Sequence, residues 1–396
     1  MGADDLISID EARARVLAEV RPLPAEDVEL QATLGRVLAA AAVAQEDLPP
    51  FDASAMDGFA VPDGRTGALR IEGESRAGAP ASSPLAPGTA CRISTGAVVP
   101  DGTYAVVPVE RTEQRGGEVV VPETKAGANI RRAGEDVQAG ETVLGPRTEI
   151  GPAELAVLAS LGIATVSCAR RPRLAVLATG DELVEPGVPL APGQIRNSNA
   201  YGVAAQAVRA GAEVVERGRV RDDPGATREA LAAVLDAADV VCVSGGVSVG
   251  PHDHVKPALA ELGVSERFWG VRLQPGKPTW FGTRDGTLVF GLPGNPVSAM
   301  VTFHLFALPA VRALQRADPG PRRAKARIAE PVKRNPRREQ MLRVRLVDDE
   351  LGRIALPTKA QQSHVLTSML DAGALARIPT GDGALKAGET VDIEFL

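Results

Sequence analysis

The sequence predicts a multidomain α/β protein built around a central three-layer α/β domain. In residues 172–318, uniformly apolar segments alternate with amphipathic ones, which is typical of a parallel sheet covered by helices on both faces. In residues 46–136, short β-rich segments are separated by Gly/Pro turns, which predicts a β-rich domain. After the Asp318–Pro321 turn, residues 322–396 again contain short β-rich segments, and we expect a small β-barrel-like domain there.

The remaining segments are assigned to an extended, helical linking domain made of residues 1–45 and 137–171. The helical segments expected in it are residues 8–20, 26–45 and 151–161. The first of them has a clear start signal, because Ser8 and Glu11 have the spacing of a capping box.

The central α/β domain alternates regularly between strands and helices. Strands are expected at 173–180, 213–220, 239–246 and 287–294, and helices at 199–210, 224–238, 253–263 and 295–316. In the C-terminal domain, strands are expected near 323–329, 341–347, 374–378 and 390–396. Open parallel sheets bind ligands at the carboxyl ends of their strands, so the loops that follow the four α/β strands are where chemistry is expected.

Charge and composition exclude several classes of protein. The net charge of −6 argues against wholesale nucleic-acid binding, and the ten Lys/Arg of residues 322–345 are interpreted as a solvated strand face because no aromatics interleave. No apolar run approaches the roughly 18 residues of a membrane helix, so no membrane is expected. The acidic N-terminus has no signal-peptide pattern, and we expect a cytoplasmic protein. Cys91, Cys168 and Cys242 are far apart and are interpreted as buried thiols.

The segment 243–254, VSGGVSVGPHDH, follows the third α/β strand. Successive backbone N–H groups around Gly245, Gly246, Ser248 and Gly250 can form a concave anion site. A plain Gly-rich strand-to-helix turn is about equally consistent with the pattern when the loop is considered alone.

The same segment contains one aspartate between two histidines. Zinc is not favoured, because His252 and His254 do not share a helix face and no third ligand cluster is visible. Asp253 suits Mg²⁺, which prefers carboxylate, water and phosphate oxygens. Its alternative role is to cap the helix that follows.

Carboxylates also follow the first two α/β strands. Glu182 comes after Thr179 and Gly180, and Asp222 comes after the second strand. Together with Asp253, three strand ends each present a carboxylate, which favours a site that handles metal and phosphate. Asp223 is expected to cap the helix that begins at Pro224.

The last α/β strand is followed by the turn GLPGNPVS, which opens a helix. Pro296 fits the first helical position with Asn295 as N-cap and Ser298 in the first turn, and Pro293 stiffens the loop. A helix N-terminus attracts anions, and Lys277 in the PGKP turn adds a cation. In isolation, a rigid turn and a solvated lysine explain the same residues.

Several longer motifs resemble one known family. They are PPFDASAMDGFA (49–60), STGAVVPDG (94–102), RRAGEDV (131–137), ATGDEL (178–183), SGGVSVGPHDHVK (244–256), PGKP (275–278) and GLPGNPVSA (291–299). In this order they resemble the molybdopterin molybdenumtransferase family, the bacterial MoeA type, which is similar to the C-terminal part of gephyrin. The resemblance covers essentially the whole chain.

The resemblance implies a reaction and an assembly. Molybdate is inserted into adenylylated molybdopterin, AMP and molybdenum cofactor are released, and a divalent metal, usually Mg²⁺, is required. The family resemblance also implies an elongated homodimer of four-domain protomers, in which the active cleft lies between the α/β domain of one subunit and the β domain of the other. A molybdopterin adenylyltransferase is a candidate partner for substrate hand-over.

The resemblance also selects site residues. The residues expected to be catalytic are Asp57, Glu182, Asp222 and Asp253, of which Glu182 and Asp253 are expected to hold metal. The expected substrate-binding residues are Thr95, Asp136, Lys277, Pro293 and Pro296, which the resemblance matches, together with the strand-end and loop residues Thr179, Gly180, Ser244, Gly245, Gly246, Ser248, Gly250, Asn295 and Ser298.

The chain departs from the family pattern at two places. Gly270 and Gln274 stand where family members often carry lysines, and Arg272 is a candidate substitute for the missing charge. These departures leave tungstate preference and an inactive paralogue open as alternatives. A third alternative is a molybdopterin adenylyltransferase, although those proteins are typically short single domains with a different Gly-rich loop.

Overall fold

The computed structural model describes residues 6–246 and 254–396. The chain forms two compact units: the larger comprises residues 1–26, 35–39 and 167–396, and the smaller comprises residues 27–34 and 40–166. Each unit has its own sheets and its own apolar core, and each is described by itself. The domain boundaries expected from the sequence stay a prediction.

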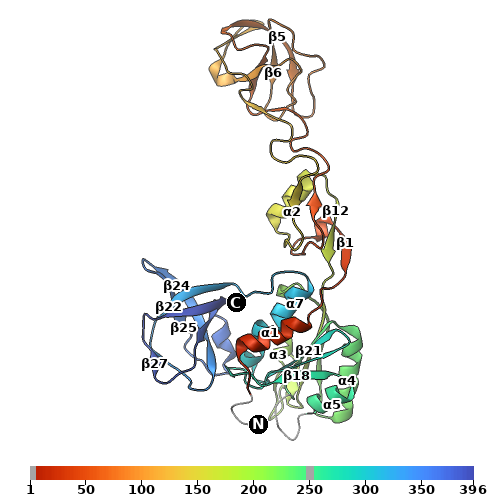
Figure 1. Cartoon of the computed structure of the whole chain (residues 1–396), viewed down its shortest axis with the longest axis vertical. Coiled ribbons are helices and arrows are strands. Elements are labelled where there is room, and N and C mark those ends of the chain that lie inside the picture. Colours follow the sequence, from red (N-terminus) through yellow and green to blue (C-terminus); the bar gives the residue numbers. More distant parts are fainter. Residues whose placement is uncertain (1–5, 247–253) are drawn as a thin grey trace. The chain divides into compact units, whose positions relative to one another are not determined.

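The larger unit contains the expected α/β sheet (Figure 1). Its parallel strands are β13 (Arg173–Thr179), β16 (Glu213–Val220), β17 (Val240–Ser244) and β21 (Thr287–Leu292). Two antiparallel strands, β20 (Trp280–Arg284) and β18 (Ser265–Trp269), complete the order β16-β13-β17-β21-β20-β18. The four parallel strands confirm the prediction, whereas the two antiparallel strands were not expected, because a short edge hairpin has no distinctive sequence period.

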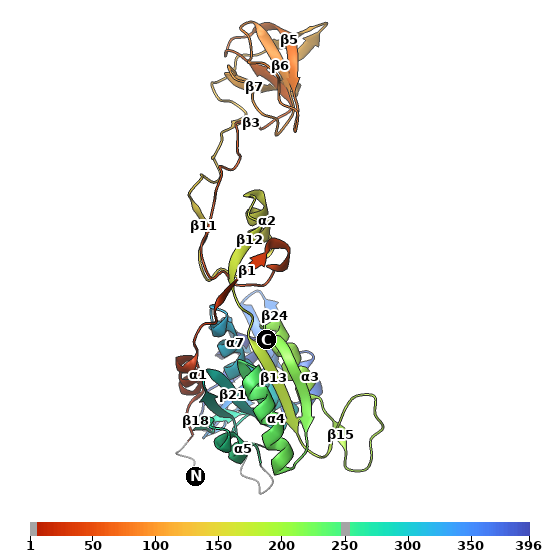
Figure 2. The same ribbon diagram turned by 90° about the vertical axis from the view of Figure 1, so that its right-hand side faces the viewer.

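Helices cover both faces of this sheet, as predicted (Figures 1 and 2). On one face, α4 (Pro224–Ala237) and α5 (Val255–Glu261) pack over Ala175, Val241 and Val289. On the other face lie α3 (Asn199–Arg209), α6 (Pro296–Thr302) and α7 (Leu308–Leu314), the last two joined by the π-helical turn η4 (Phe303–Ala307). The cap expected at Asp223 is present, because its side chain accepts from the N–H of Ala226 at 2.7 Å. Asn295 occupies the N-cap position of α6, but its side chain makes no capping hydrogen bond.

The continuous helix Pro296–Leu314 is long and apolar enough, with a mean hydropathy of 1.5, to cross a membrane by composition alone. The sequence reading missed it as a candidate, since His304 and Arg312 interrupt the apolar run. In this fold 78% of its apolar window is buried, and its side chains pack in the core beneath the sheet. Its hydropathy is therefore accounted for by core packing.

The N-terminal segment departs partly from expectation. The predicted first helix is present as α1 (Ile9–Glu19), with the Ser8 hydroxyl accepting from the N–H of Glu11 at 3.1 Å. The helix expected within 26–45 is wrong: this segment holds the strand β1 (Ala25–Glu29), the 3-10 turn η2 (Leu30–Ala32) and the strand β2 (Ala42–Val43). Strand β1 pairs with β12 (Thr165–Ala169), so pairing with a distant segment overrides the helical spacing.

The C-terminal residues form the expected barrel. Strands β24 (Glu339–Asp349), β25 (Gly352–Pro357), β22 (Arg323–Ile328), β28 (Thr390–Phe395) and β26 (Ala374–Ile378) follow one another, and pairing of β24 with β26 closes the circle. The short strands β23 (Val332–Lys333) and β27 (Ala384–Leu385) pair beside it, and η5 (Leu366–Met369) precedes β26. Strand β19 (Leu273–Gln274), from the PGKP region, adds to β24.

The smaller unit is mostly β, as predicted. Its six-stranded sheet has the order β7 (Ala105–Pro108), β4 (Gly58–Val61), β6 (Thr89–Ile93), β5 (Gly67–Ser75), β9 (Glu118–Val121) and β8 (Glu113–Arg115). Also in this unit are β3 (Ala53–Ser54), β10 (Ile130–Arg131), β11 (Thr142–Leu144), the 3-10 turn η3 (Val109–Arg111) and α2 (Pro152–Ser160). The short parallel strands β14 (Leu183–Val184) and β15 (Ile195–Arg196) pair with each other and belong to the larger unit.

Candidate functional site

The carboxyl ends of the four parallel strands lie side by side. Thr179 of β13 is paired with Val220 of β16, and Ser244 of β17 is paired with Leu292 of β21. The segments that follow, which hold Glu182, Asp222, Gly245 and Pro293, therefore leave the sheet at one edge. The structure thus brings together residues that are up to 111 positions apart in sequence, from Glu182 to Pro293.

The Gly-rich loop begins in a conformation that requires glycine. Gly245 and Gly246 have φ of 93° and 64°. A Cβ on Gly245 would lie 2.7 Å from Thr179 Oγ1, and one on Gly246 would lie 2.6 Å from Val255 Cγ2. Both backbone torsion and space therefore exclude larger residues. Ser248, Gly250 and Asp253, predicted here as anion and metal ligands, lie outside the described residues.

An asparagine that the sequence reading missed holds this edge together. Asn199, the first residue of α3, donates through Nδ2 to Ser244 Oγ at 2.8 Å and to the Gly294 carbonyl at 2.7 Å. The Ser244 hydroxyl in turn donates to the Pro293 carbonyl at 3.2 Å. Ser244 is only 2% exposed, so its hydroxyl holds the turn before α6 in place. Ser298 is likewise buried, at 3% exposure.

The two described strand-end carboxylates are exposed. Glu182 folds back over Gly180: a Cβ at Gly180 would lie 2.4 Å from Glu182 Oε2. Asp222 follows β16, and its backbone N–H donates to Asp181 Oδ1 at 3.2 Å. These oxygens can accept protons or hold a hard cation. Directly before α5, the N-cap position is occupied by His254, which makes no side-chain capping hydrogen bond.

Lys277 lies at the same edge of the sheet. Trp280 of β20 is paired with Gly291 near the end of β21, and the exposed Lys277 comes three residues before Trp280. The backbone of its turn is fixed, because the Lys277 carbonyl accepts from the N–H of Val271 at 3.0 Å. The lysine thus adds positive charge at this edge of the sheet.

The C-terminal barrel also contributes to this edge. The backbone N–H of Val297, in the first turn of α6, donates to the Ser363 carbonyl at 3.1 Å. The loop that carries Ser363 is held by Arg343 of β24, which donates through Nη2 to the carbonyls of Ala360 at 3.0 Å and Gln362 at 3.3 Å. A barrel loop and the helix N-terminus therefore meet.

Arg343 is unusual because it is fully buried and has no ionic partner in the part of the chain that the structure describes. Its exposure is 0%, its Nε donates to Ser368 Oγ at 3.2 Å, and no carboxylate among the described residues forms an ion pair with it. Burial lowers the pKa of Arg343 to about 10. The sequence interpretation of residues 322–345 as a solvated face is therefore wrong for Arg343, since loop 358–368 covers it. A buried cation without a counter-charge favours a bound anion nearby.

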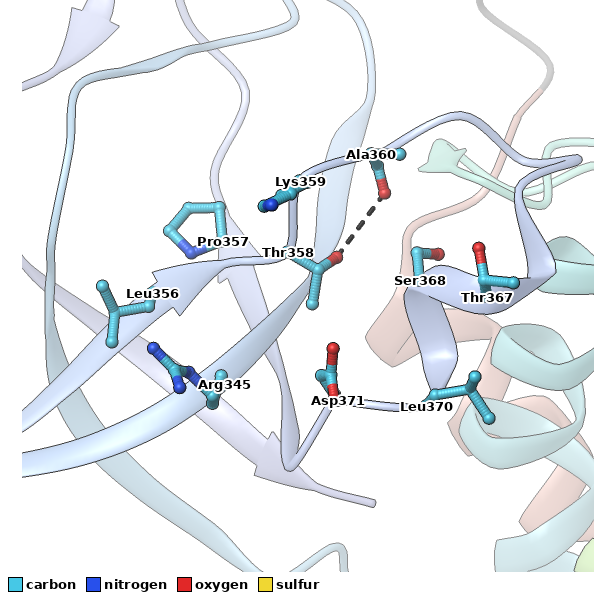
Figure 3. Close-up of a pocket in the computed structure, with 10 residues that line it drawn as sticks. All are labelled: Arg345, Leu356, Pro357, Thr358, Lys359, Ala360, Thr367, Ser368, Leu370 and Asp371. Atoms are coloured by element: carbon cyan, nitrogen blue, oxygen red, sulfur yellow. Dashed lines mark hydrogen bonds between the residues drawn. The ribbon is translucent and has the colours of Figure 1, made fainter.

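A hollow of about 680 Å³ lies beside the same loop. Figure 3 shows Thr358, Lys359 and Ala360 on one side of it, with Arg345 and Asp371 on the others. Its lining combines two cations with hydroxyl groups and one carboxylate.

Two of the sequence-predicted residues of the smaller unit, Asp57 and Thr95, are in direct contact. Asp57 Oδ1 accepts from the backbone N–H of Thr95 at 2.7 Å and from its hydroxyl at 3.1 Å. Asp52, in the same loop as Asp57, pairs with Arg132 at 2.5 Å. Hydrogen bonding to the backbone of residue 133, and the charge of Arg132, hold the pKa of Asp52 below its usual value. The exposed Asp136 is anchored through its N–H to the Leu48 carbonyl at 3.0 Å.

Comparisons with known proteins agree with this arrangement. Family models for the MoeA N-terminal region (domain I and II), a probable molybdopterin binding domain and the MoeA C-terminal region (domain IV) match residues 7–162, 175–313 and 325–396. A molybdopterin molybdenumtransferase of Haemophilus influenzae is 36% identical over 398 residues, covering 98% of each chain. The chain belongs to the MoeA family of molybdopterin molybdenumtransferases.

Other relatives extend this membership. A molybdopterin molybdenumtransferase of Bacillus subtilis is 34% identical and covers 98% of this chain and 93% of its own. The crystal structure of a molybdopterin biosynthesis MoeA protein from Pyrococcus horikoshii superposes with a TM-score of 0.84 at 30% identity, covering 98% of this chain and 99% of its own. The fold class predicted from the sequence is confirmed, and the adenylyltransferase alternative is not favoured.

The structure explains the two departures from the MoeA pattern. Gly270 has a φ of 88°, and a Cβ there would lie 2.6 Å from Leu6 Cδ2, so a lysine does not fit this backbone. Gln274 Oε1 accepts from Asn335 Nδ2 at 2.8 Å. The glutamine therefore ties the PGKP region to the barrel. Among the residues that the structure describes, no cluster of three or more His, Cys, Asp or Glu is placed to hold a metal ion.

Proposed function

We propose that this member of the MoeA family inserts molybdate into adenylylated molybdopterin and releases molybdenum cofactor and AMP. One observation carries the proposal: buried Arg343, without a counter-charge, holds the loop that meets the N-terminal turn of α6. Two sources of positive potential at one place suit a small, doubly charged oxyanion such as molybdate. Family membership supplies the reaction class, a transferase of molybdenum cofactor biosynthesis.

The strand-end loops would bind and orient the second substrate. The Gly245 N–H donates to the Leu292 carbonyl at 3.1 Å, so Gly246 is the described glycine of the SGGVSVG loop whose backbone would approach phosphate. Lys277 supplies a cation at the same edge. Exchange of molybdate oxygens for sulfur requires protons on the departing oxygens. Glu182 and Asp222, both exposed at neighbouring strand ends, are the described groups suited to carry those protons.

The carboxylates at this edge fit Mg²⁺, because their hard oxygens match its ligand preference. Glu182 and Asp253 would hold the ion, with Asp253 outside the described residues. When bound, Mg²⁺ would neutralise charge on the pyrophosphate that is cleaved. Glu182 is exposed, so its carboxylate is free to take part without breaking the fold.

We further propose that the enzyme is a cytoplasmic homodimer whose active site lies between the subunits. Asp57 supports this, because its exposed carboxylate is fixed by two hydrogen bonds from Thr95 while serving no packing role. A residue held this rigidly on a surface is prepared for a partner or substrate. A molybdopterin adenylyltransferase would supply the adenylylated substrate.

Molybdate-dependent AMP release tests the reaction. The purified chain, given adenylylated molybdopterin, Mg²⁺ and molybdate, should release AMP, and Glu182→Gln should slow the release by about 100-fold. Asp236→Asn is the matched control: Asp236 is exposed on α4 and pairs with Arg284 at 3.2 Å, away from the strand ends. The alternative reaction, in which the chain consumes ATP, adenylylates molybdopterin and releases pyrophosphate but no AMP, would contradict the proposal.

A further inference from the structure

The N-terminal helix α1 contacts two parts of the larger unit through one side chain. Arg13 donates through Nε to the Leu305 carbonyl in the π-helical turn at 3.1 Å. Its Nη1 and Nη2 donate to Glu394 Oε1 and Oε2, on barrel strand β28, at 3.3 and 2.9 Å. A helix from the N-terminal segment therefore links the site helix Pro296–Leu314 to the C-terminal barrel.

This ion pair is buried, and its carboxylate is shared by two arginines. Arg13 is 7% and Glu394 2% exposed, and Glu394 Oε1 also accepts from Arg323 Nη2 at 2.9 Å. A bidentate pair shielded from water has defined geometry, and removal of one partner leaves a charge poorly compensated. The contact therefore fixes an orientation more strictly than a surface ion pair does.

A second ion pair joins the same helix to the barrel. Asp10 accepts from Arg377 Nη1 and Nη2, on β26, at 3.0 and 2.8 Å, and Arg377 Nε donates to Glu339 on β24 at 2.5 Å. Between the two pairs, Ile9, Ala12 and Val16 lie in one apolar core with Met341 and Leu375 of the barrel. Helix α1 thus forms ion pairs with two barrel strands, β28 and β26, and Arg377 links the second pair to β24.

The attachment of α1 to the barrel affects the site because the barrel is connected to the site helix at two points. One is the Ser363 carbonyl on the N–H of Val297, and the other is Glu394, through Arg13, on Leu305. These points are eight residues apart, about 12 Å along a helix. Together with the pairing of β19 with β24 and the Gln274–Asn335 hydrogen bond, these two attachments resist rotation of the barrel on the linker 315–322.

We propose that α1 is a strap that keeps the barrel loop of Ser363 against α6, and that Arg13 is its positioning residue. The inference rests on the proposed function only for its kinetic consequence. Without the strap, a smaller fraction of molecules has the loop in place, so the apparent affinity for molybdate falls in proportion to that fraction. Saturating molybdate restores the arrangement in which the Ser363 loop lies against α6, so kcat is largely unchanged.

Pulsed electron–electron double resonance tests the orientation of the barrel relative to the α/β sheet directly. Spin labels are placed on cysteines introduced at Glu229, exposed on α4, and Leu351, which is 80% exposed at the barrel's β24–β25 turn. The three native cysteines are buried. Arg13→Met should broaden the label-to-label distance distribution, and Arg13→Lys should restore part of the original width. The control is Glu11→Gln, which removes the exposed Glu11–Arg15 pair on the same helix.

Kinetics provide the second readout. Arg13→Met should raise the KM for molybdate about tenfold with kcat within about twofold, and Glu11→Gln should change neither. If Arg13→Met does not fold, Glu394→Gln is measured in its place. An unchanged distance distribution in a folded Arg13→Met or Glu394→Gln chain overturns the strap, as does a loss of kcat with KM unaltered. If the wild-type chain releases no AMP, the proposed function fails while the distance measurement still decides the strap.

Discussion

Replacement of Arg343 by methionine is the most informative single change, because it removes the buried cation and keeps a similar apolar stem. Two opposing effects act on stability. Burial lowers the pKa of Arg343 to about 10, which means that the charged form is disfavoured in the fold by on the order of 3 kcal/mol. Loss of its hydrogen bonds to Ser368, Ala360 and Gln362 costs about 1.5 kcal/mol each.

These effects nearly cancel in the absence of ligand. We therefore expect Arg343→Met to lower the free energy of unfolding by only about 1–2 kcal/mol, a small shift in Tm for a unit of this size. An anion beside the guanidinium changes the balance. At 100 times its Kd, molybdate should stabilise the wild-type chain by about 2.7 kcal/mol, and this gain should vanish in the variant.

The assay is thermal unfolding with and without molybdate, together with calorimetric titration of the anion. The matched control is Arg345→Met, two residues along the same strand, where the side chain is exposed. The control should keep most of the stabilisation by molybdate. If Arg343→Met keeps it as well, the anion does not bind beside the buried guanidinium, and the observation that carries the proposed function is refuted.

Three further predictions follow from the same contacts. Gln274→Lys should lower the KM for molybdate several-fold and make it more sensitive to salt, because a cation replaces the amide that now pairs with Asn335. If the site is shared between subunits, mixing inactive Asp57→Asn and Glu182→Gln chains should restore about a quarter of wild-type activity, and no recovery would mean that each site is built from one chain. Burial lowers the pKa of His304 to about 4, so the unfolded chain binds the extra proton and stability should fall by up to about 3 kcal/mol as the pH drops from 6.5 towards 4. Urea unfolding across this window should show a flatter pH dependence in His304→Gln.

The α/β strands and their helices could be predicted because their signals are local. Asp223 and Pro224, or Asn295 and Pro296, define helix starts without reference to the rest of the chain. Strand β1 could not be predicted in this way. Val28 is the one buried position of residues 25–29, and the strand pairs with a segment about 140 residues later in the chain. Its conformation is decided by a partner that no window of sequence contains.

The candidate site divides in the same way. Strand-end residues such as Glu182 and Lys277 could be placed at one edge because parallel strands align their carboxyl ends. Asn199 could have been suspected, since it opens the helix after the first strand, but its hydrogen bonds to Ser244 and Gly294 depend on the sheet order. Asp57 and Thr95 needed the family resemblance, because their pairing joins two loops of irregular structure.

The basic run of residues 322–345 shows why composition alone misled. Its charges have different fates in the fold: Arg323 and Arg327 pair with Glu394 and Asp349, whereas Arg343 has no carboxylate partner among the described residues. The difference arises from the position of Arg343 on β24. Side chains alternate along this strand, so Leu342 and Val344 lie inside the barrel and Arg343 lies on the face that loop 358–368 covers. Evolution of a purely structural loop would favour an apolar residue or a paired charge at that position. A buried cation that lacks a carboxylate partner among the described residues is consistent with a role in binding.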